Sequence, residues 1–236
     1  MPNFKFKKSD KILDIGGAMK QRTDCQVDTL LDIIHPQNAP YGPTKLLAKN
    51  FVHVDLMREK LPFKDKEFDF CFCTHTLEDL PYPFGVIEEM QRVAKRGYIA
   101  TPAMGQDIIF SNINFTDWAS GARRVPGHSH HKWLFFVKNG VLQVLPKNYG
   151  VLYSSNFHFT KWLGSPETEF YWEGKIKYKE VKDLDIHLLI REYRKYINAN
   201  KNNLVKGTPL IYFDKPIWYV KELVKFFLMK GEGFNR

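Results

Sequence analysis

Short apolar runs alternate with polar stretches through the first half of the chain. Five of these runs end at a glycine, an acid, a proline or a short polar segment, and they cover residues 11–15, 27–34, 51–54, 68–73 and 98–100. Runs of this length are typical of strands buried in a parallel sheet. Residues 84–94 instead place apolar side chains at helical spacing, and Gly97 follows as a stop, which predicts an amphipathic crossover helix. The alternation predicts an α/β fold with a doubly wound, mostly parallel sheet.

The first connection in this predicted sheet is unusually short. Only about eleven residues separate the first two apolar runs. A parallel crossover needs about a dozen residues or more, including its helix. We therefore expect the first helix to be very short or absent.

The second half of the chain predicts a hairpin and helices. Residues 132–147 contain two apolar runs around Asn139-Gly140, the strongest two-residue hairpin signal, so we expect an antiparallel hairpin that extends the sheet. Helices with apolar and basic faces are predicted over residues 181–199 and 216–230. They either pack on the domain or, for a basic helix, lie on an anionic membrane surface. We divide the chain into a core of residues 1–147 and a C-terminal extension of residues 148–236, which could cover a substrate.

A glycine turn and a row of acids follow the predicted strands. Gly16 and Gly17 end the first run, and glycine lets a ligand approach the backbone because it has no Cβ. Asp14 lies near the end of that strand, and Asp32 and Asp55 lie at the ends of the second and third. Carboxylates at these positions can accept hydrogen bonds from ribose hydroxyls and from the adenine amine. The pattern predicts a site for an adenosine-type ligand, and because no dinucleotide fingerprint or P-loop follows the turn, the site needs no phosphate.

Residues 55–102 carry an ordered series of short motifs. An Asp-Leu pair is followed by Leu-Pro-Phe, by Phe-Asp before the fourth strand, by a His and Leu-Glu after it, and by a helix that ends in Arg-Val. This series resembles the class I S-adenosylmethionine-dependent methyltransferases, in particular the type 11 group, whose first motif corresponds to residues 11–17. The resemblance covers about residues 9–105. It implies a Rossmann-like methyltransferase fold and S-adenosylmethionine as the cofactor.

The resemblance also implies which side chains surround the cofactor. It places three groups along the methionine and ribose, one at the ribose hydroxyls, two beside adenine and two beside the sulfonium. Asp14, Gly16 and Gly17 would lie along the methionine and ribose, and Asp32 would bind the ribose hydroxyls. Asp55 and Leu56 would flank adenine, and Thr74 and His75 would lie beside the sulfonium.

Three histidines, His128, His130 and His131, lie within four positions just before the hairpin. They could be surface residues, metal ligands or a general base. Adjacent histidines on a strand would point to opposite faces, and no nearby acid or cysteine completes a ligand set, so we predict no metal. A hydroxyl acceptor must lose a proton as it attacks the methyl group, and His75, His130 and His131 are the candidate catalytic bases.

Composition narrows the setting. The chain has 236 residues, a net charge of +9 and 44% hydrophobic residues, with its lysines scattered along the sequence. No apolar run reaches the roughly 18 residues of a spanning helix, and the N-terminus carries no secretory signal, so we expect a cytoplasmic protein. The three cysteines form no paired motif, which argues against a disulfide framework and a zinc knuckle.

The predicted function is S-adenosylmethionine-dependent methyl transfer to a small-molecule or sugar acceptor, at a hydroxyl oxygen. A nucleic-acid methyltransferase is one alternative, because the chain is basic. It is opposed by Cys73-Thr74-His75, where such enzymes carry Asn-Pro-Pro-aromatic, and by the lack of a clustered basic face. The other alternative is a non-catalytic binding protein on a degenerate methyltransferase fold, because the first glycine loop is shortened.

Overall fold

The computed structural model describes residues 4–40, 42–110, 125–154, 159–182 and 185–206, together with Val220 and Val224. The helix predicted over residues 216–230 lies outside the described residues except at those two positions. Within the described ranges, no helix has both the length and the apolar character needed to span a bilayer.

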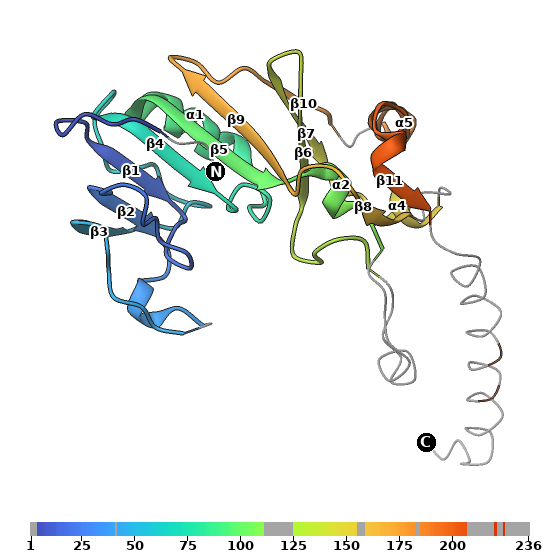
Figure 1. Ribbon diagram of the computed structural model, residues 1–236, viewed down its shortest axis with the longest axis horizontal. Coiled ribbons are helices and arrows are strands. Elements are labelled where there is room, and N and C mark those ends of the chain that lie inside the picture. The colour runs from blue at the N-terminus through green and yellow to red at the C-terminus, as the bar shows by residue number, and fades with distance from the viewer. Residues whose placement is uncertain are drawn as a thin grey trace.

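Six strands form the main sheet, in the order β3-β2-β1-β4-β5-β9 (Figure 1). Their bounds are β1 (Ile12–Ile15), β2 (Thr29–Asp32), β3 (Asn50–His53), β4 (Phe68–Thr74), β5 (Ala94–Pro102) and β9 (Glu167–Glu173). The first five pair in parallel, whereas β9 runs antiparallel to β5. The predicted α/β fold with a mostly parallel sheet is confirmed. In sheets of this order, ligands bind where the strand order reverses, which here is between the carboxyl ends of β1 and β4.

The two faces of the main sheet are covered differently. Helix α1 (Pro83–Val93) buries Ile87 and Met90 in the same cluster as Leu13 and Ile15. On the other face, Phe4 and Phe6 of the N-terminal segment pack against a layer of aromatic side chains, formed by Phe70, Phe72 and Tyr98. These aromatic rings take the place of a second layer of helices.

The connections confirm that the first helix is missing. Between β1 and β2 the chain makes only turns and bends, and between β2 and β3 it forms one short 3-10 helix, η1 (Pro36–Asn38). Most of the loop at the end of β1 is therefore irregular backbone, held by side-chain contacts.

The predicted hairpin is confirmed as β6 (Trp133–Lys138) and β7 (Val141–Pro146). Asn139 and Gly140 turn the chain with φ of 51° and 69°, as a type I′ turn requires. The expectation that the hairpin extends the main sheet is wrong, because β9 occupies the edge beside β5. The hairpin instead forms a three-stranded sheet with β10 (Tyr178–Glu180).

Both faces of the hairpin are buried, each in a different hydrophobic cluster. Phe135 and Val144 belong to the core of the main sheet, whereas Leu134 and Leu145 belong to a second hydrophobic cluster. Alternate residues along a strand point to opposite faces, so one hairpin can serve two cores.

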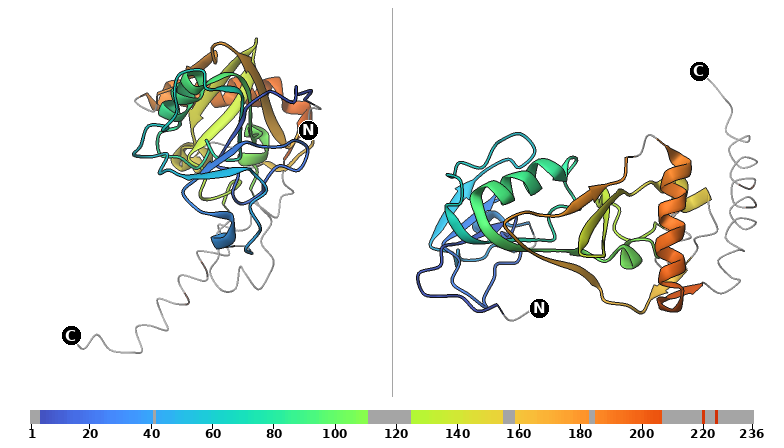
Figure 2. Two further views of the ribbon diagram at one scale, coloured as in Figure 1. Left: turned by 90° about the vertical axis from the view of Figure 1, so that its left-hand side faces the viewer. Right: turned by 90° about the horizontal axis from the view of Figure 1, so that it is seen from above.

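The second cluster collects the remaining elements, which lie at the far end of the molecule from β3 (Figure 2). These are α2 (Met104–Asp107), α4 (Tyr149–Ser154), β8 (Phe159–Trp162), α5 (Ile186–Ala199) and β11 (Leu204–Lys206). The short helix η2 (Lys201–Asn203) connects α5 to β11 and has no buried residue. Helix α5 corresponds to the helix predicted over residues 181–199, and it begins at Asp185, whose carboxylate accepts from the His187 and Leu188 amides. The division at residue 147 stays a prediction, and β9 pairs with β5 across it.

We predict that Gly97 is required for the packing of β9. A Cβ at Gly97 would lie 2.3 Å from the Cys71 carbonyl oxygen and 2.8 Å from the Trp172 ring, so Gly97→Ala should lower the free energy of unfolding by about 1–3 kcal/mol. Gly85 on α1 is the matched control. A Cβ there meets nothing closer than 3.7 Å, and Gly85→Ala should raise stability by up to about 1 kcal/mol. Urea titration of both variants tests this, and equal effects would contradict the packing described.

Candidate functional site

Most of the predicted site residues follow the carboxyl ends of the parallel strands. Gly16 and Gly17 follow β1, Asp32 ends β2, and His75 follows β4. Because the strands are parallel and adjacent, these groups lie along one edge of the sheet. The edge also receives the segment before β6, which brings in the other histidines.

The glycine turn is in direct contact with the loop after β4. Gly16 has a φ of 75°, and a Cβ there would lie 2.1 Å from the Thr76 hydroxyl oxygen. That hydroxyl donates to the carbonyl oxygens of Ile15, at 3.4 Å, and Thr74, at 3.2 Å. Only glycine fits between β1 and Thr76 in this conformation. The ends of β1 and β4 are thus joined at the point where the strand order reverses.

Asp14 is a buried acid beneath this turn. Its side chain packs against Gly17, and the residue is only 3% exposed. Burial raises the pKa of Asp14 to about 7, with Arg22 acting against it and the charge of Asp32 adding to it. At neutral pH its carboxyl group can therefore both donate and accept hydrogen bonds.

Asp32 supports the same turn from the neighbouring strand. One carboxylate oxygen accepts from the Ala18 amide at 3.0 Å, and the other accepts from the Ile34 amide at 3.1 Å. Each oxygen keeps a second lone pair that can accept from a ligand hydroxyl. Sequence patterns identified Asp32 as a ligand-binding acid but not this second role as a brace for the turn.

Asp55 lies farther along the edge, after β3. One of its oxygens accepts from the Met57 amide at 3.0 Å, and the other is 3.5 Å from the Arg58 side chain. Leu56 packs against the main core and lines a cavity of about 230 Å³ together with Tyr82. The adenine-flanking roles of Asp55 and Leu56 stay predictions.

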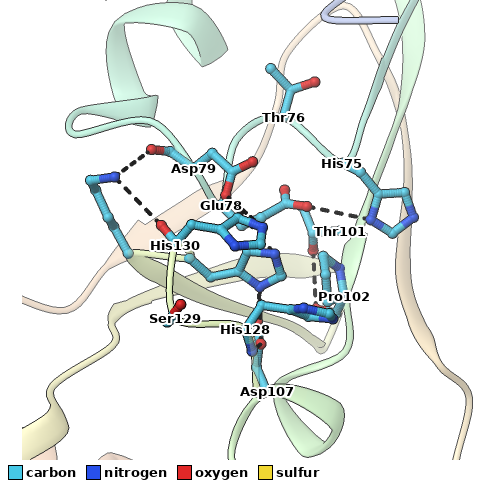
Figure 3. Close-up of polar contacts among 12 residues, drawn as sticks. His75, Thr76, Glu78, Asp79, Thr101, Pro102, Asp107, His128, Ser129 and His130 are labelled. Atoms are coloured by element: carbon cyan, nitrogen blue, oxygen red, sulfur yellow. Dashed lines mark hydrogen bonds and ion pairs between the residues drawn. The ribbon is translucent and has the colours of Figure 1, made fainter. Parts of the chain in front are cut away.

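A second cavity of about 390 Å³ lies at the ends of β4 and β5, and we call it the histidine cavity (Figure 3). Its walls come from the loop after β4, the end of β5, α2, the turn before β6 and the start of β9. The lining residues are His75, Glu78, Asp79, Pro102, Gln106, His128, His130, His131, Pro166 and Glu167.

His75 is held between two acids. Its Nε2 is 3.0 Å from Glu167 and its Nδ1 is 3.4 Å from Glu78. The bond with Glu78 and the contact with Glu167 raise the pKa of His75 to about 9, against the effect of burial. Its backbone has a φ of 52°, in the left-handed region that residues other than glycine rarely adopt. His75 is therefore an imidazolium at neutral pH, which makes it a hydrogen-bond donor and a poor base.

His131 is oriented by a buried acid that sequence patterns did not single out. Its Nδ1 is 2.7 Å and 2.9 Å from the two oxygens of Asp107. The buried Lys147 ammonium is 3.2 Å from Asp107 and donates to the His128 carbonyl at 2.7 Å. Although burial acts to raise it, the pKa of Asp107 is lowered by His131 and Lys147. In the neutral form of His131, Nδ1–H donates to Asp107, and Nε2 is then the acceptor nitrogen.

The reason given for rejecting a metal at the histidines is wrong. His130 and His131 lie in the turn before β6 rather than on a strand, and their ring centroids are 4.6 Å apart. Asp79, which is distant in sequence, approaches Nε2 of His130 at 3.8 Å and Nε2 of His131 at 3.9 Å. An acid therefore completes a set of three potential ligands.

The strand order and the parallel pairing of β1 to β5 define a Rossmann-like α/β domain. A family model described as "Methyltransferase domain" matches residues 31–100. The match spans β3 and β4 and includes Asp32, Asp55 and His75, whereas the glycine turn precedes it. The resemblance to S-adenosylmethionine-dependent methyltransferases is confirmed over this stretch, and S-adenosylmethionine is the cofactor of that class.

Several solved structures resemble part of the chain. A methyltransferase from Methanosarcina mazei is 24% identical over 42% of this chain and 55% of its own, with a TM-score of 0.33. A methyltransferase from Aquifex aeolicus is 24% identical over 42% of this chain and 59% of its own, with a TM-score of 0.31. A methyltransferase in complex with the Haloferax volcanii activator Trm112 is 22% identical over 41% of this chain and 47% of its own, with a TM-score of 0.31. The chain spans about half the length of these structures, and no curated protein matches it.

We predict that His75 titrates well above the usual range of histidine. The ion pairs of His75 make their full contribution to the free energy of unfolding at pH values below 6.5, its ordinary pKa. This contribution is lost as the pH rises through about 9. NMR titration of the His75 imidazole should give a midpoint near 9, and Glu167→Gln should lower it. Glu180→Gln on β10 should leave it unchanged. A midpoint near 6.5 in the wild type would rule out the two ion pairs.

Proposed function

We propose that this protein transfers a methyl group from S-adenosylmethionine to an acceptor bound in the histidine cavity. The contact between Gly16 and Thr76 is the observation that best supports the proposal. Thr76 belongs to the loop after β4 that also carries His75, Glu78 and Asp79 into the cavity. A cofactor at the glycine turn would therefore have its reactive end next to the cavity.

The cavity offers two kinds of histidine for methyl transfer. Such a reaction is an in-line displacement in which a hydroxyl acceptor loses its proton as it attacks, so it needs a base and a means of orientation. His131 has the geometry of a base, because Asp107 holds the Nδ1 proton and leaves Nε2 free to accept. Both ring N–H groups of His75 face carboxylates, Nε2 facing Glu167 and Nδ1 facing Glu78, so this imidazolium holds the two acids at the cavity and adds a positive charge there. His130 is more exposed and lies at the mouth.

The size and chemistry of the cavity favour a small polar acceptor. A volume of about 390 Å³ falls within the range of small-molecule sites. Its walls carry carboxylates and imidazoles, which can bind several hydroxyl groups at once. We therefore propose a hydroxylated small molecule or a sugar, methylated at oxygen. A cytoplasmic location and contact of residues 216–230 with a membrane surface remain expectations.

One observation favours a second candidate function. Both oxygens of Asp32 already bind backbone amides, and no helix follows the glycine turn before β2. A site that uses its acids to hold its own loops could have lost the cofactor. The second candidate is a binding protein on a methyltransferase fold.

We predict that Asp32→Ala weakens the binding of S-adenosylmethionine by about 1–3 kcal/mol, because charge-assisted hydrogen bonds are lost. Isothermal titration calorimetry measures this directly. Asp32→Asn keeps one acceptor oxygen and should lose less of the affinity for the cofactor. Asp65 precedes β4 at the opposite edge of the sheet, so Asp65→Ala should leave the affinity unchanged. Absence of heat with the wild type at millimolar cofactor would favour the binding-protein candidate. Unchanged affinity in Asp32→Ala would remove Asp32 from the site.

The acceptor class can be tested with cofactor labelled at its methyl group. The protein is incubated with fractionated cell extract, and the label is followed into small-molecule, glycan, lipid and nucleic-acid pools. We expect label in the small-molecule or glycan pool, and less of it with His131→Gln. Label in RNA or DNA would instead establish the nucleic-acid alternative.

A further inference from the structure

Three potential metal ligands converge on one side of the histidine cavity, from two loops far apart in the chain. An oxygen of Asp79 and one nitrogen each of His130 and His131 all lie within 4.8 Å of one another. Asp79 follows β4, whereas the histidines precede β6. We propose that these three side chains bind a divalent transition-metal ion, with zinc as the best fit.

The distances suit ligands of a shared ion better than hydrogen-bond partners. Asp79 Oδ1 is 3.8 Å from Nε2 of His130 and 3.9 Å from Nε2 of His131, whereas hydrogen bonds are about 2.7–3.2 Å long. Two ligands, each about 2.0–2.1 Å from a tetrahedral zinc, lie roughly 3.3–3.4 Å apart, so each of these two distances must shorten by about half an ångström when the ion binds. The ligand nitrogens of His130 and His131 lie within 4.8 Å of each other, and His130 is the exposed one of the pair, so its ring is the ligand that has room to move.

The buried oxygen of Asp79 supplies an independent reason. Oδ1 is shielded from solvent, and no described residue gives it a hydrogen bond. The Asp79 side chain as a whole is 44% exposed, so this oxygen carries a moderate cost of desolvation, which a cation would remove. This oxygen is the atom that faces both histidines.

His131 is already arranged as a metal ligand would be. Metal-binding histidines commonly donate their other ring N–H to a carboxylate, which sets the orientation of the ring. Nδ1 of His131 lies 2.7 Å from Asp107, itself held by Lys147 at 3.2 Å and the His128 amide at 3.3 Å. The lone pair of Nε2 is therefore directed away from Asp107, on the side where Asp79 approaches.

The backbones of the two loops are tied together as well. The Lys132 ammonium donates to the carbonyl of Asp79 at 3.0 Å and to that of His130 at 3.5 Å. The Lys132 amide also donates to the Glu78 carbonyl at 2.6 Å. The ligand positions are thus held close before any ion binds.

The donor set indicates the type of metal. Two imidazoles and one carboxylate suit zinc and its neighbours, whereas calcium and magnesium prefer oxygen ligands. Three protein ligands leave a coordination position open, and all three ligands line the histidine cavity. Glu78 lines it too, and its buried Oε2 receives no hydrogen bond from a described residue. That oxygen can accept from a water or a hydroxyl at the open position.

A role for the ion follows only if the proposed methyl transfer holds. A bound metal lowers the pKa of an acceptor hydroxyl, so it would replace His131 as the means of removing the proton. The metal site itself does not depend on methyl transfer.

The test is a cobalt titration of the full chain after treatment with a chelator and dialysis. We expect binding of one equivalent of Co²⁺, seen as visible d–d absorption, and its displacement by Zn²⁺. Asp79→Asn and His130→Ala should each weaken binding about 10–100-fold or more. His187→Ala, an exposed histidine at the start of α5, is the matched control and should bind as the wild type does.

Absence of cobalt absorption at millimolar metal, or unchanged binding in both ligand variants, would overturn the site. Equal loss in His187→Ala would do the same. Thermal unfolding, monitored by circular dichroism, checks that each variant is folded. If Asp79→Asn does not fold, the result for His130→Ala decides, because His130 is exposed and its replacement should not disturb the fold. Calorimetry with S-adenosylmethionine separates the two proposals. Metal binding without cofactor binding would overturn only the methyl transfer, and cofactor binding without metal binding would overturn only the metal site.

Discussion

The buried carboxylate of Asp107 is the contact on which the arrangement of the site depends. It binds His131, which precedes β6, and Lys147, which follows β7, so it holds both ends of the hairpin where they meet. Removing one partner from a buried ion pair costs about 3–5 kcal/mol, so the three groups stay together. Because Asp107 lies in α2, directly after β5, this contact anchors the hairpin to the carboxyl edge of the main sheet.

Anchoring the hairpin there brings two incomplete sites together. The glycine turn packs against Thr76 and the Asp14 carboxyl group, and Asp32 supports it through two backbone amides. The histidine cavity supplies the imidazolium of His75 and, in His131, a candidate base or metal ligand. Thr76 touches Gly16 on one side and belongs to the loop that lines the cavity on the other. Both parts therefore lie at the switch point of the sheet, where α/β proteins with this strand order bind their ligands.

Local patterns were sufficient for the elements whose signal is local. Apolar runs predicted the five parallel strands, helical spacing predicted α1, and Asn139-Gly140 predicted the hairpin. The place of β9 could not be predicted in this way. Its buried residues alternate as in any strand with one buried face, and nothing in residues 167–173 indicates that it pairs with β5. A strand pattern gives the faces of a strand but not its partner.

The same distinction between local and distant signals applies to the residues of the candidate site. The glycine turn and the acids are placed by strand ends, so the sequence indicated them. The partners of the histidines are not local: Glu167 is 92 residues from His75, and Asp107 is 24 residues from His131.

The central claim is that the glycine turn and the histidine cavity form one site, and NMR with S-adenosylhomocysteine tests it most directly. The account predicts that the amides of Gly16 and Thr76 and the imidazole of His75 shift together, with a common dissociation constant. Shifts that leave either the turn or the cavity unaffected at saturation would contradict it.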